Sequence, residues 1–440
     1  MKGLRSFLVL LVIAAALAGY LYYDSKREPA DDKKQEKVFA GVQSDKIERV
    51  TVRSVAGDRT TIEKQGTAWR VTQPAPVPAD EAELSGITSN LASVQVQRVV
   101  DDQATDFKQY GLDPARIEVG FKFAGKDQAL LIGQKTPTGA DLYARVPDKP
   151  RVFLVPSYLE STFNKSSFDL RDKTILKIDR EKVDHMEIET PDQTLKLAKQ
   201  GADWRLTAPT DARADFGAVE GIIGRLNTTP MKAIVAGETG EVNDAKEYGL
   251  DKPTATVRVT SGSAQAGLAI GKSAGDGVFY AKDLSRPLVF TVEQALLDEL
   301  KKPAADFRIK DLFDARAFNT ARIEIVRNGQ TTVFEKEKGK DTWKQTAPAQ
   351  KAADTAKVEA LLTALSNTRA SSFVEKMSDT GLDSPELTIG VTFDEPQRKE
   401  RVAFAHKGSD AYARREGDAS AAKIEAPALD AITKAIEALK

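Results

Sequence analysis

Cysteine is absent from the 440-residue chain. Its absence excludes disulfide bonds, thiol catalysis, zinc sites built on cysteine and a cysteine-linked lipid anchor. Histidine is scarce, with only His185 and His406 in the whole sequence. Neither histidine has a second one at a metal-ligand spacing. We therefore expect both imidazoles to be solvated or partly packed, and we expect no metal site and no cofactor.

An excess of either charge is also lacking. The chain carries 64 basic and 65 acidic residues, which gives a net charge of −1. Nucleic-acid-binding proteins normally show a large basic excess, so we expect no nucleic-acid partner. The hydrophobic share of 41% is typical of globular domains, and the length predicts about three of them.

A long apolar run occurs only at the N-terminus, where Lys2 and Arg5 precede 17 uncharged residues at positions 7–23. A cleaved signal peptide fits this run, with the small residues 16–18 as its cleavage site. An uncleaved transmembrane anchor fits it too. We favour the anchor over residues 1–23, because the apolar run continues into aromatic residues that suit a membrane interface. A core helix is a third interpretation, disfavoured by the terminal position.

Residues 24–37 follow, and ten of these fourteen residues are charged. Such a composition cannot form a core and predicts a solvated tether. With the basic residues held in the cytoplasm, the orientation places everything after the tether outside it. We therefore expect a single-pass membrane protein with its bulk on the extracytoplasmic side.

The rest of the chain is one module written three times. The only three tryptophans each open the same short phrase, Trp-x-x-Thr-x-Pro, at Trp69, Trp204 and Trp343. Fifteen, eighteen and twenty-two residues after each tryptophan stand apolar residues that share one helical face: Leu84, Ile87 and Leu91, then Val219, Ile222 and Leu226, then Val358, Leu361 and Leu365. We expect the tryptophans to be core residues that pack on these helices.

Two further landmarks recur in each copy. An aspartate stands where each helix would begin, at Asp80, Asp215 and Asp354. Its carboxylate suits the unpaired backbone N–H groups of the first turn. The phrase Gly-Leu-Asp recurs at residues 111–113, 249–251 and 381–383, and predicts a turn closed by a left-handed glycine. Alternating apolar runs surround these landmarks, and the pair Asn328-Gly329 predicts a hairpin.

Each module thus reads as three strands, a helix, four strands and a closing helix, with short turns that favour antiparallel sheets. The predicted fold class is α+β, not a parallel βαβ arrangement. Similar linkers at residues 168–173 and 306–311 give the predicted domains: an anchor, a tether and three modules, at 1–23, 24–37, 38–175, 176–314 and 315–440.

Comparison of the three copies disfavours most candidate catalytic and nucleotide-binding residues. Gly271-Lys272-Ser273 suggests a phosphate loop, but Ala266 replaces the required first glycine and we expect a plain turn between short strands, without nucleotide. Acidic pairs such as Asp101 with Asp102 occur by chance among 65 acids. The recurrent Asp113, Asp251 and Asp383 favour turns over catalysis. Serine nucleophiles lack a Gly-x-Ser-x-Gly elbow.

One recurrent set keeps a functional interpretation. A tyrosine is followed two residues later by a cation on the same strand face, which is an arrangement that can stack on and charge-pair with a ligand. Cross-strand packing explains the same pattern more simply. The candidate ligand or partner surface consists of Tyr143, Arg145, Tyr280, Lys282, Tyr412 and Arg414.

These motifs together resemble an uncharacterised bacterial family, catalogued as domain of unknown function 4340 (DUF4340). The resemblance covers about residues 38–440 and rests on the N-terminal anchor, the tryptophan phrase, the amphipathic helix and the Gly-Leu-Asp turn. It implies a single-pass envelope protein of the bacterial inner membrane, with its modules on the periplasmic side, that works beside ABC-transporter components similar to those of gliding motility. No catalytic residues are known for the family, so the resemblance transfers none to this chain. The third copy departs from the pattern at Thr380, where the others have tyrosine, and lacks the pairs Ile132-Gly133 and Ile270-Gly271.

The sequence therefore predicts a non-enzymatic, membrane-tethered interaction or scaffold protein of the cell envelope. Two alternatives stay open. One is a module that binds an envelope glycan or another polymer through the tyrosine set. The other is a hydrolase that uses a carboxylate pair, which requires a deep acidic cleft.

Overall fold

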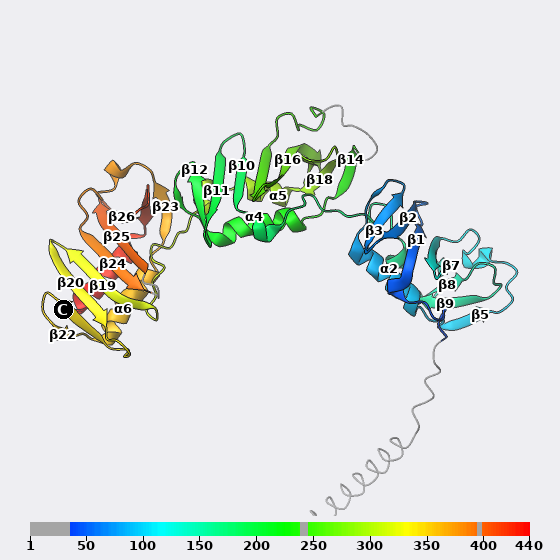
Figure 1. The fold of residues 1–440 in the computed structure, drawn as a ribbon, viewed down its shortest axis with the longest axis horizontal. Helices are drawn as coiled ribbons and strands as arrows, with labels where there is room; N and C mark the ends of the chain where they lie inside the picture. The colour runs from blue at the N-terminus through cyan, green and yellow to red at the C-terminus, as the bar shows by residue number, and fades with distance from the viewer. Residues whose placement is uncertain (1–35, 238–244, 394–397) are drawn as a thin grey trace, which may run out of the picture. The chain divides into compact units, whose positions relative to one another are not determined.

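The structure is a computed structural model that describes residues 36–237, 245–393 and 398–440 (Figure 1). It contains three sheets of nine strands each, and every strand pair that they contain is antiparallel. The strand order in the first sheet is β4-β3-β2-β1-β6-β7-β8-β9-β5, and the same order repeats in the other two. We call each sheet with its helices module 1, 2 or 3.

Module 1 begins with a short 3-10 helix at Ser44–Lys46 and closes with α3. Its strands and helices are β1 (Ile47–Arg53), β2 (Arg59–Gln65), β3 (Ala68–Gln73), β4 (Val77–Pro78), α2 (Glu81–Ser93), β5 (Arg98–Asp101), β6 (Ile117–Phe123), β7 (Lys126–Lys135), β8 (Asp141–Arg145), β9 (Val152–Pro156) and α3 (Leu159–Phe163).

Module 2 has the same elements in the same order. They are β10 (His185–Glu189), β11 (Thr194–Gln200), β12 (Asp203–Ala208), β13 (Ala212–Arg213), α4 (Phe216–Thr228), β14 (Ala233–Ala236), β15 (Ala255–Ser261), β16 (Ala264–Gly275), β17 (Val278–Asp283), β18 (Val289–Glu293) and α5 (Gln294–Leu300).

Module 3 ends in a longer closing helix than the other two. Its elements are β19 (Thr320–Arg327), β20 (Gln330–Lys336), β21 (Trp343–Ala347), β22 (Lys351–Ala352), α6 (Thr355–Ser366), β23 (Ala370–Val374), β24 (Leu387–Phe393), β25 (Arg398–Lys407), β26 (Asp410–Arg415), β27 (Ala421–Ile424) and α7 (Ala426–Ala438).

The repeated apolar residues form the cores, as predicted. Trp69, Trp204 and Trp343 are 8%, 2% and 2% exposed, and all nine residues of the predicted helix faces are at most 1% exposed. In modules 1 and 3 the tryptophan belongs to the same apolar cluster as the helix face. Strand side chains alternate, because successive residues point to opposite faces of the sheet. One face of each sheet is therefore buried under the helices, and the other carries the polar residues.

The recurrent aspartates cap the main helices, as predicted. The Asp80 carboxylate accepts backbone hydrogen bonds from the N–H groups of Ala82 at 3.1 Å and Glu83 at 3.2 Å. The Asp215 carboxylate accepts from Ala218 at 2.8 Å. The Asp354 carboxylate does the same for the first turn of α6. Each cap satisfies N–H groups that have no partner inside the helix.

The predicted turns are also present. Asn328 and Gly329 have φ of 50° and 74° between β19 and β20, which is the type of backbone that a two-residue hairpin requires. Gly111, Gly249 and Gly381 have φ of 67°, 68° and 72°, in the left-handed region. The expected strand count was too low, because β4 and β5 and their counterparts in modules 2 and 3 are additional short strands. Edge strands of two to five residues carry too little alternation to be recognised from sequence.

The linkers pair with the modules that precede them. Arg171 bridges to Ala79, and Arg308 bridges to Ala214, both antiparallel. The backbone contacts divide the chain into one unit that ends at Lys173 and a second from Thr174 to Lys440. The predicted boundary near residue 175 thus lies at the division between the units, whereas the one near 314 lies inside the second unit.

The N-terminal anchor and most of the tether were predicted for residues that lie outside the described part of the chain. Within the described ranges, no helix combines the length and the apolar character needed to cross a membrane.

Candidate functional site

The predicted ligand-binding tyrosines lie on β8, β17 and β26, one in each sheet, on the face away from the main helices. The Tyr143 ring packs against Tyr110 with 5.0 Å between centroids. The Tyr280 ring packs against Tyr248 with 5.1 Å between centroids. In module 3 Thr380 replaces this partner, and the Tyr412 hydroxyl lies 3.4 Å from the Asp410 carboxylate. Because all three tyrosines are half-buried, packing between neighbouring segments accounts for their recurrence.

The three cations of the set do not share one environment. Arg145 lies over the Phe107 ring, with its guanidinium carbon 4.1 Å from the centroid. Arg414 donates from Nε to the Asp418 carbonyl at 3.2 Å and is exposed. Lys282 is half-buried. The six residues therefore sit on three separate sheets, and their role in ligand binding stays a prediction.

A close backbone approach explains the Ile-Gly pairs. A Cβ on Gly133 would lie 2.1 Å from the Tyr110 carbonyl oxygen, and one on Gly271 would lie 2.1 Å from the Tyr248 carbonyl oxygen. Only glycine admits the tyrosine segment so close to the strand. In module 3 Ala405 occupies this place beside Gly381, where a Cβ on Gly381 would lie 3.5 Å from the Ala405 Cβ. The third copy thus changes both sides of this contact together: threonine replaces the tyrosine, and alanine replaces the glycine.

The expectation that Gly271-Lys272-Ser273 forms a turn between short strands was wrong. These residues lie inside the long strand β16, not in a turn between short strands. The pairing of β16 with β17 slips between Ile270 and Ser273, so the glycine marks an irregularity within a strand. The next element along the chain is the strand β17 and not a helix, and the Lys272 N–H is already bonded to the Tyr248 carbonyl at 3.0 Å. The segment therefore lacks the free N–H groups of a phosphate loop.

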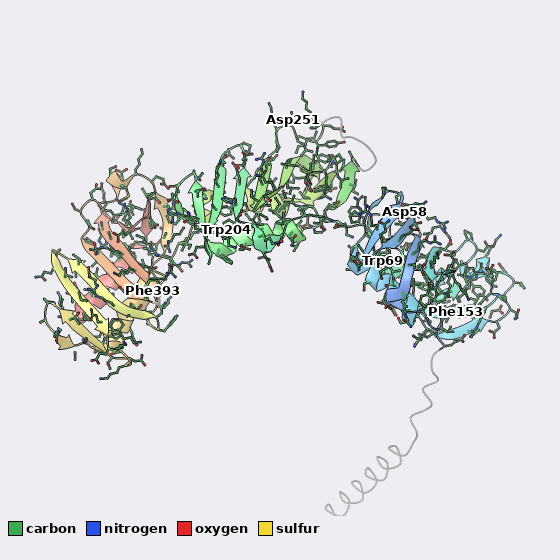
Figure 2. The ribbon with its side chains drawn as sticks, in the orientation of Figure 1. Asp58, Trp69, Phe153, Trp204, Asp251 and Phe393 are labelled. Atoms are coloured by element: carbon green, nitrogen blue, oxygen red, sulfur yellow. The ribbon has the colours of Figure 1, made fainter. Side chains whose placement is uncertain are left out.

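The remaining candidates for catalysis are surface groups. Both histidines are exposed: His185 Nδ1 lies 2.7 Å from Asp184, and His406 Nδ1 lies 2.7 Å from Glu386. Asp113, Asp251 and Asp383 are exposed in their turns, and Figure 2 labels Asp251. Among the described residues, no three His, Cys, Asp or Glu side chains gather closely enough to hold a metal ion.

Sequence reasoning missed two equivalent grooves on the polar sheet faces. A groove of about 430 Å³ lies over β11, β10, β15 and β16 in module 2 and is lined by Glu187, Lys196 and Arg258. A groove of about 970 Å³ lies over the matching strands of module 1 and is lined by Thr51, Thr61 and Gly120, among others. The sequence feature that could have indicated the grooves is a small residue at an outward-facing strand position. Ala129 lies opposite Gly120 in module 1, and Gly267 lies opposite Arg258 in module 2.

In module 3 the strands β24, β25 and β26 line a smaller groove of about 250 Å³, and Arg401 is among its lining residues. Arg401 stands opposite Gly390 in the strand register, where the other modules have Ala129 and Gly267. Its guanidinium lies 3.4 Å from the Glu324 carboxylate. The grooves of modules 1 and 2 present charges of both signs on an open surface, so neither offers the deep acidic cleft that a carboxylate hydrolase requires.

A cluster of charges joins modules 2 and 3, and the sequence did not reveal it. Arg213 from β13 lies 3.1 Å from the Asp314 carboxylate. Arg415 from β26 lies 3.4 Å from Asp314 and 2.9 Å from Glu400. The Glu400 carboxylate also accepts from the Asp314 N–H at 3.0 Å. We call Arg213, Asp314, Glu400 and Arg415 the junction cluster.

The pKa values of the two acids in the junction cluster are shifted in opposite directions. Burial raises the pKa of Glu400, and the neighbouring Asp314 charge adds to this against the effect of Arg415. Burial acts on Asp314 in the same direction, but Arg213 and Arg415 outweigh it and hold its pKa below the ordinary value. Asp314 is therefore the ionised centre that attracts arginines from two modules.

Arg308 of the second linker strengthens the same junction. Its guanidinium lies over the Phe373 ring at 3.5 Å, 3.3 Å from Glu375, and it also bonds the Ser420 hydroxyl. All three partners belong to module 3, whereas the Arg308 backbone pairs with module 2. This side chain is 5% exposed, so it acts as a structural tie between the modules.

Three antiparallel nine-stranded sheets, each backed by helices, define a tandem-repeat protein of the α+β class. The chain belongs to the family of the domain of unknown function DUF4340, whose model matches residues 69–203 and 204–385. This match confirms the family resemblance drawn from the motifs.

Other comparisons add little. No curated protein matches the chain. A sliding clamp (DNA polymerase III subunit beta) from Pseudomonas aeruginosa is 8% identical with a TM-score of 0.16, over 87% of this chain and 91% of that one. A transferrin binding protein B from Neisseria meningitidis is 10% identical with a TM-score of 0.08, over 83% of this chain and 65% of that one. Scores this low carry no information on fold or function.

Proposed function

We propose that this chain is a non-enzymatic interaction protein of the bacterial envelope, tethered to the inner membrane by its N-terminal segment. One observation carries the proposal. Apart from the tyrosine and cation set, the residues that recur in all three modules pack a core, cap a helix or close a turn, and none of them gathers into a reactive group. Repetition of a structural module enlarges the solvent-exposed surface of the protein, and that surface is available to bind a partner.

Membrane attachment is the part of the proposal that rests on residues 1–37. The apolar run and the charged tether support it, together with the charge pattern before the run. The modules would then lie in the periplasm. ABC-transporter components are the partner class that the family resemblance suggests first.

A fractionation experiment tests the attachment. The full chain should stay in the membrane pellet after an alkaline carbonate wash and should be digested by protease added to spheroplasts but not to intact cells. A variant without residues 1–37 should leave the pellet. Recovery of the full chain in the soluble fraction would contradict the tether.

Photo-crosslinking in native membranes tests the interaction. Large apolar side chains stand exposed at Tyr158, Phe216 and Phe318, which are 59%, 57% and 83% exposed, and each site accepts a photoreactive residue without disturbing a core. We expect at least one site to give an adduct of discrete mass with a transporter component. The adduct should disappear when residues 1–37 are removed. Three sites without any adduct would remove the support for a partner.

A further inference from the structure

The outer edge of the third sheet differs from the outer edges of the other two. Each sheet ends in a two-residue strand, β4, β13 or β22, that leads into the main helix. We call residues 351–354 of module 3 the terminal edge, and Figure 1 labels β22 there. The same stretch in module 1 is 77–80, and in module 2 it is 212–215.

In modules 1 and 2 the following linker pairs with this edge through two backbone hydrogen bonds. The Asp80 N–H donates to the Leu170 carbonyl at 2.9 Å, and the Asp172 N–H donates to the Pro78 carbonyl at 2.9 Å. In module 2 the Asp215 N–H donates to the Phe307 carbonyl at 2.7 Å, and the Ile309 N–H donates to the Arg213 carbonyl at 3.1 Å. The linker therefore acts as a tenth, antiparallel strand.

The terminal edge is built in the same way, but no strand among the described residues pairs with its outer side. The Ala353 N–H donates to the Trp343 carbonyl at 3.0 Å, as Ala79 does to Trp69. Within the described ranges, however, the Asp354 N–H and the Ala352 carbonyl have no backbone partner. Exposure agrees: Ala79 and Ala214 are 6% and 2% exposed, whereas Ala353 is half-buried and Asp354 is exposed.

The apolar core of module 3 does not need the missing strand. In module 1 the linker residue Leu170 belongs to the core cluster. In module 3 the longer helix α7 supplies Ile432 and Ile436 to the core cluster instead. What remains open at the terminal edge is thus a pair of backbone groups, and an extended segment can bind there through main-chain hydrogen bonds.

Charge distinguishes the terminal edge as well. Lys351 and Lys357 are both exposed, where module 1 has Val77 and Glu83 and module 2 has two alanines. Among the described residues, the Lys351 ammonium donates one hydrogen bond, at 3.5 Å to the Lys440 backbone oxygen. Lysines on an open edge discourage pairing with another copy of the same edge. They favour an incoming strand that carries acidic side chains.

We propose that the terminal edge binds an acidic, extended segment of a partner polypeptide, which adds as an antiparallel strand between the Ala352 carbonyl and the Asp354 N–H. The segment takes the place that the linkers occupy in modules 1 and 2. Its carboxylates meet Lys351 and Lys357. This inference rests on the proposed interaction function and names the chemistry of one partner contact.

Disulfide trapping tests the proposal in the purified full chain, which has no cysteine of its own. The bridge between Ala79 and Arg171 is a non-hydrogen-bonded antiparallel pair, whose short Cα separation suits a disulfide. The variant Ala353→Cys is therefore mixed with the peptide Phe-Asp-Leu-Cys-Asp-Glu, supplied as its mixed disulfide with glutathione. Exchange releases glutathione and leaves peptide bound to the protein, which is measured by intact mass.

The expected result has three parts. Peptide accumulates on Ala353→Cys in preference to Ala352→Cys, because residue 352 points to the opposite face of the strand. A matched peptide with lysine in place of its acids accumulates about tenfold less, at about threefold for each exposed ion pair. The double variant Lys351→Glu with Lys357→Glu reverses this preference.

Equal trapping at positions 352 and 353, or a preference of the wild-type edge for the basic peptide, overturns the proposal. Trp343 fluorescence, measured with phenylalanine in place of Trp69 and Trp204, shows whether each cysteine variant keeps the fold of module 3. The trapping result is independent of the membrane experiments. If trapping fails but the photo-crosslinked adduct forms, only the proposed binding at the terminal edge is rejected. If the adduct does not form but trapping succeeds, the proposed envelope role is rejected.

Discussion

At the scale of single residues, recurrence in this protein marks structural necessity. The tryptophans are buried, the aspartates cap helices, and the paired tyrosines pack against each other on the polar sheet face. The glycines Gly133 and Gly271 exist because another backbone segment passes where a side chain would stand. Comparing three copies of one module therefore separates packing from chemistry without any other sequence.

A substitution at Gly271 should reveal this constraint. Gly271→Ala places a methyl group 2.1 Å from the Tyr248 carbonyl oxygen. We expect module 2 to lose about 1–3 kcal/mol of unfolding free energy, as in other overpacked sites. Denaturant unfolding followed by Trp204 fluorescence, with phenylalanine in place of the other two tryptophans, measures the loss. Gly221→Ala, on the exposed side of α4 with nothing within 4 Å, is the control and should be neutral or stabilising. Equal effects of the two variants would contradict the argument.

At the scale of elements, the local sequence was sufficient to predict each helix or strand that is long or that carries a characteristic capping or turn residue. The main helices have an apolar face and a capping aspartate, and the hairpin at Asn328 has its turn residues. The short strands β4 and β5 have neither, and Gly271 lies within a strand although its neighbours resemble a loop. Pairing with a neighbour defines these elements, and a neighbour in space cannot be read from a local window.

The capping aspartates offer an element-scale prediction. Asp215→Ala removes the acceptor of the Ala218 N–H bond at the start of α4. We expect a loss of about 1 kcal/mol in module 2, whereas Asp215→Asn, which retains a capping oxygen, should change stability little. Unfolding followed by Trp204 fluorescence, in the background with phenylalanine at the other two tryptophan sites, measures both variants. An asparagine variant as unstable as the alanine variant would assign the effect to charge and not to capping.

At the scale of the whole molecule, the modules are related by sequence but not equally joined. The chain divides after Lys173, while modules 2 and 3 share one unit that contains the junction cluster. Arginines from β13 and β26 converge on Asp314, and Arg308 reaches across from the linker. Charged contacts between partly buried groups of different modules can couple their unfolding.

Each module holds one tryptophan, so the coupling can be measured directly. In variants with a single tryptophan and phenylalanine at the other two sites, Trp204 and Trp343 should report unfolding midpoints closer to each other than to that of Trp69. Asp314→Asn should separate them, with a loss of about 2 kcal/mol, less than for a fully buried pair because Asp314 keeps some solvent contact.

Acid should have the same effect as Asp314→Asn. Because the pKa of Asp314 is lowered in the folded state, its stabilising contribution is present above the unfolded value of about 3.9 and is lost as the pH falls below it. The raised pKa of Glu400 acts in the opposite sense, since protonation suits its buried site. If the Asp314→Asn variant shows the same acid dependence as the wild type, the assignment to Asp314 is wrong.

The sequence by itself determined the three-module plan, the α+β class, the buried tryptophans, the helix faces with their caps, and the family. These features depend on periodicity and on residues a few positions apart, so they survive in a single sequence read three times. Only the tertiary structure decided the strand order, the grooves, the junction cluster and the open edge at β22. Each of these depends on which segments lie side by side, and that follows from packing and pairing between residues tens to a hundred positions apart.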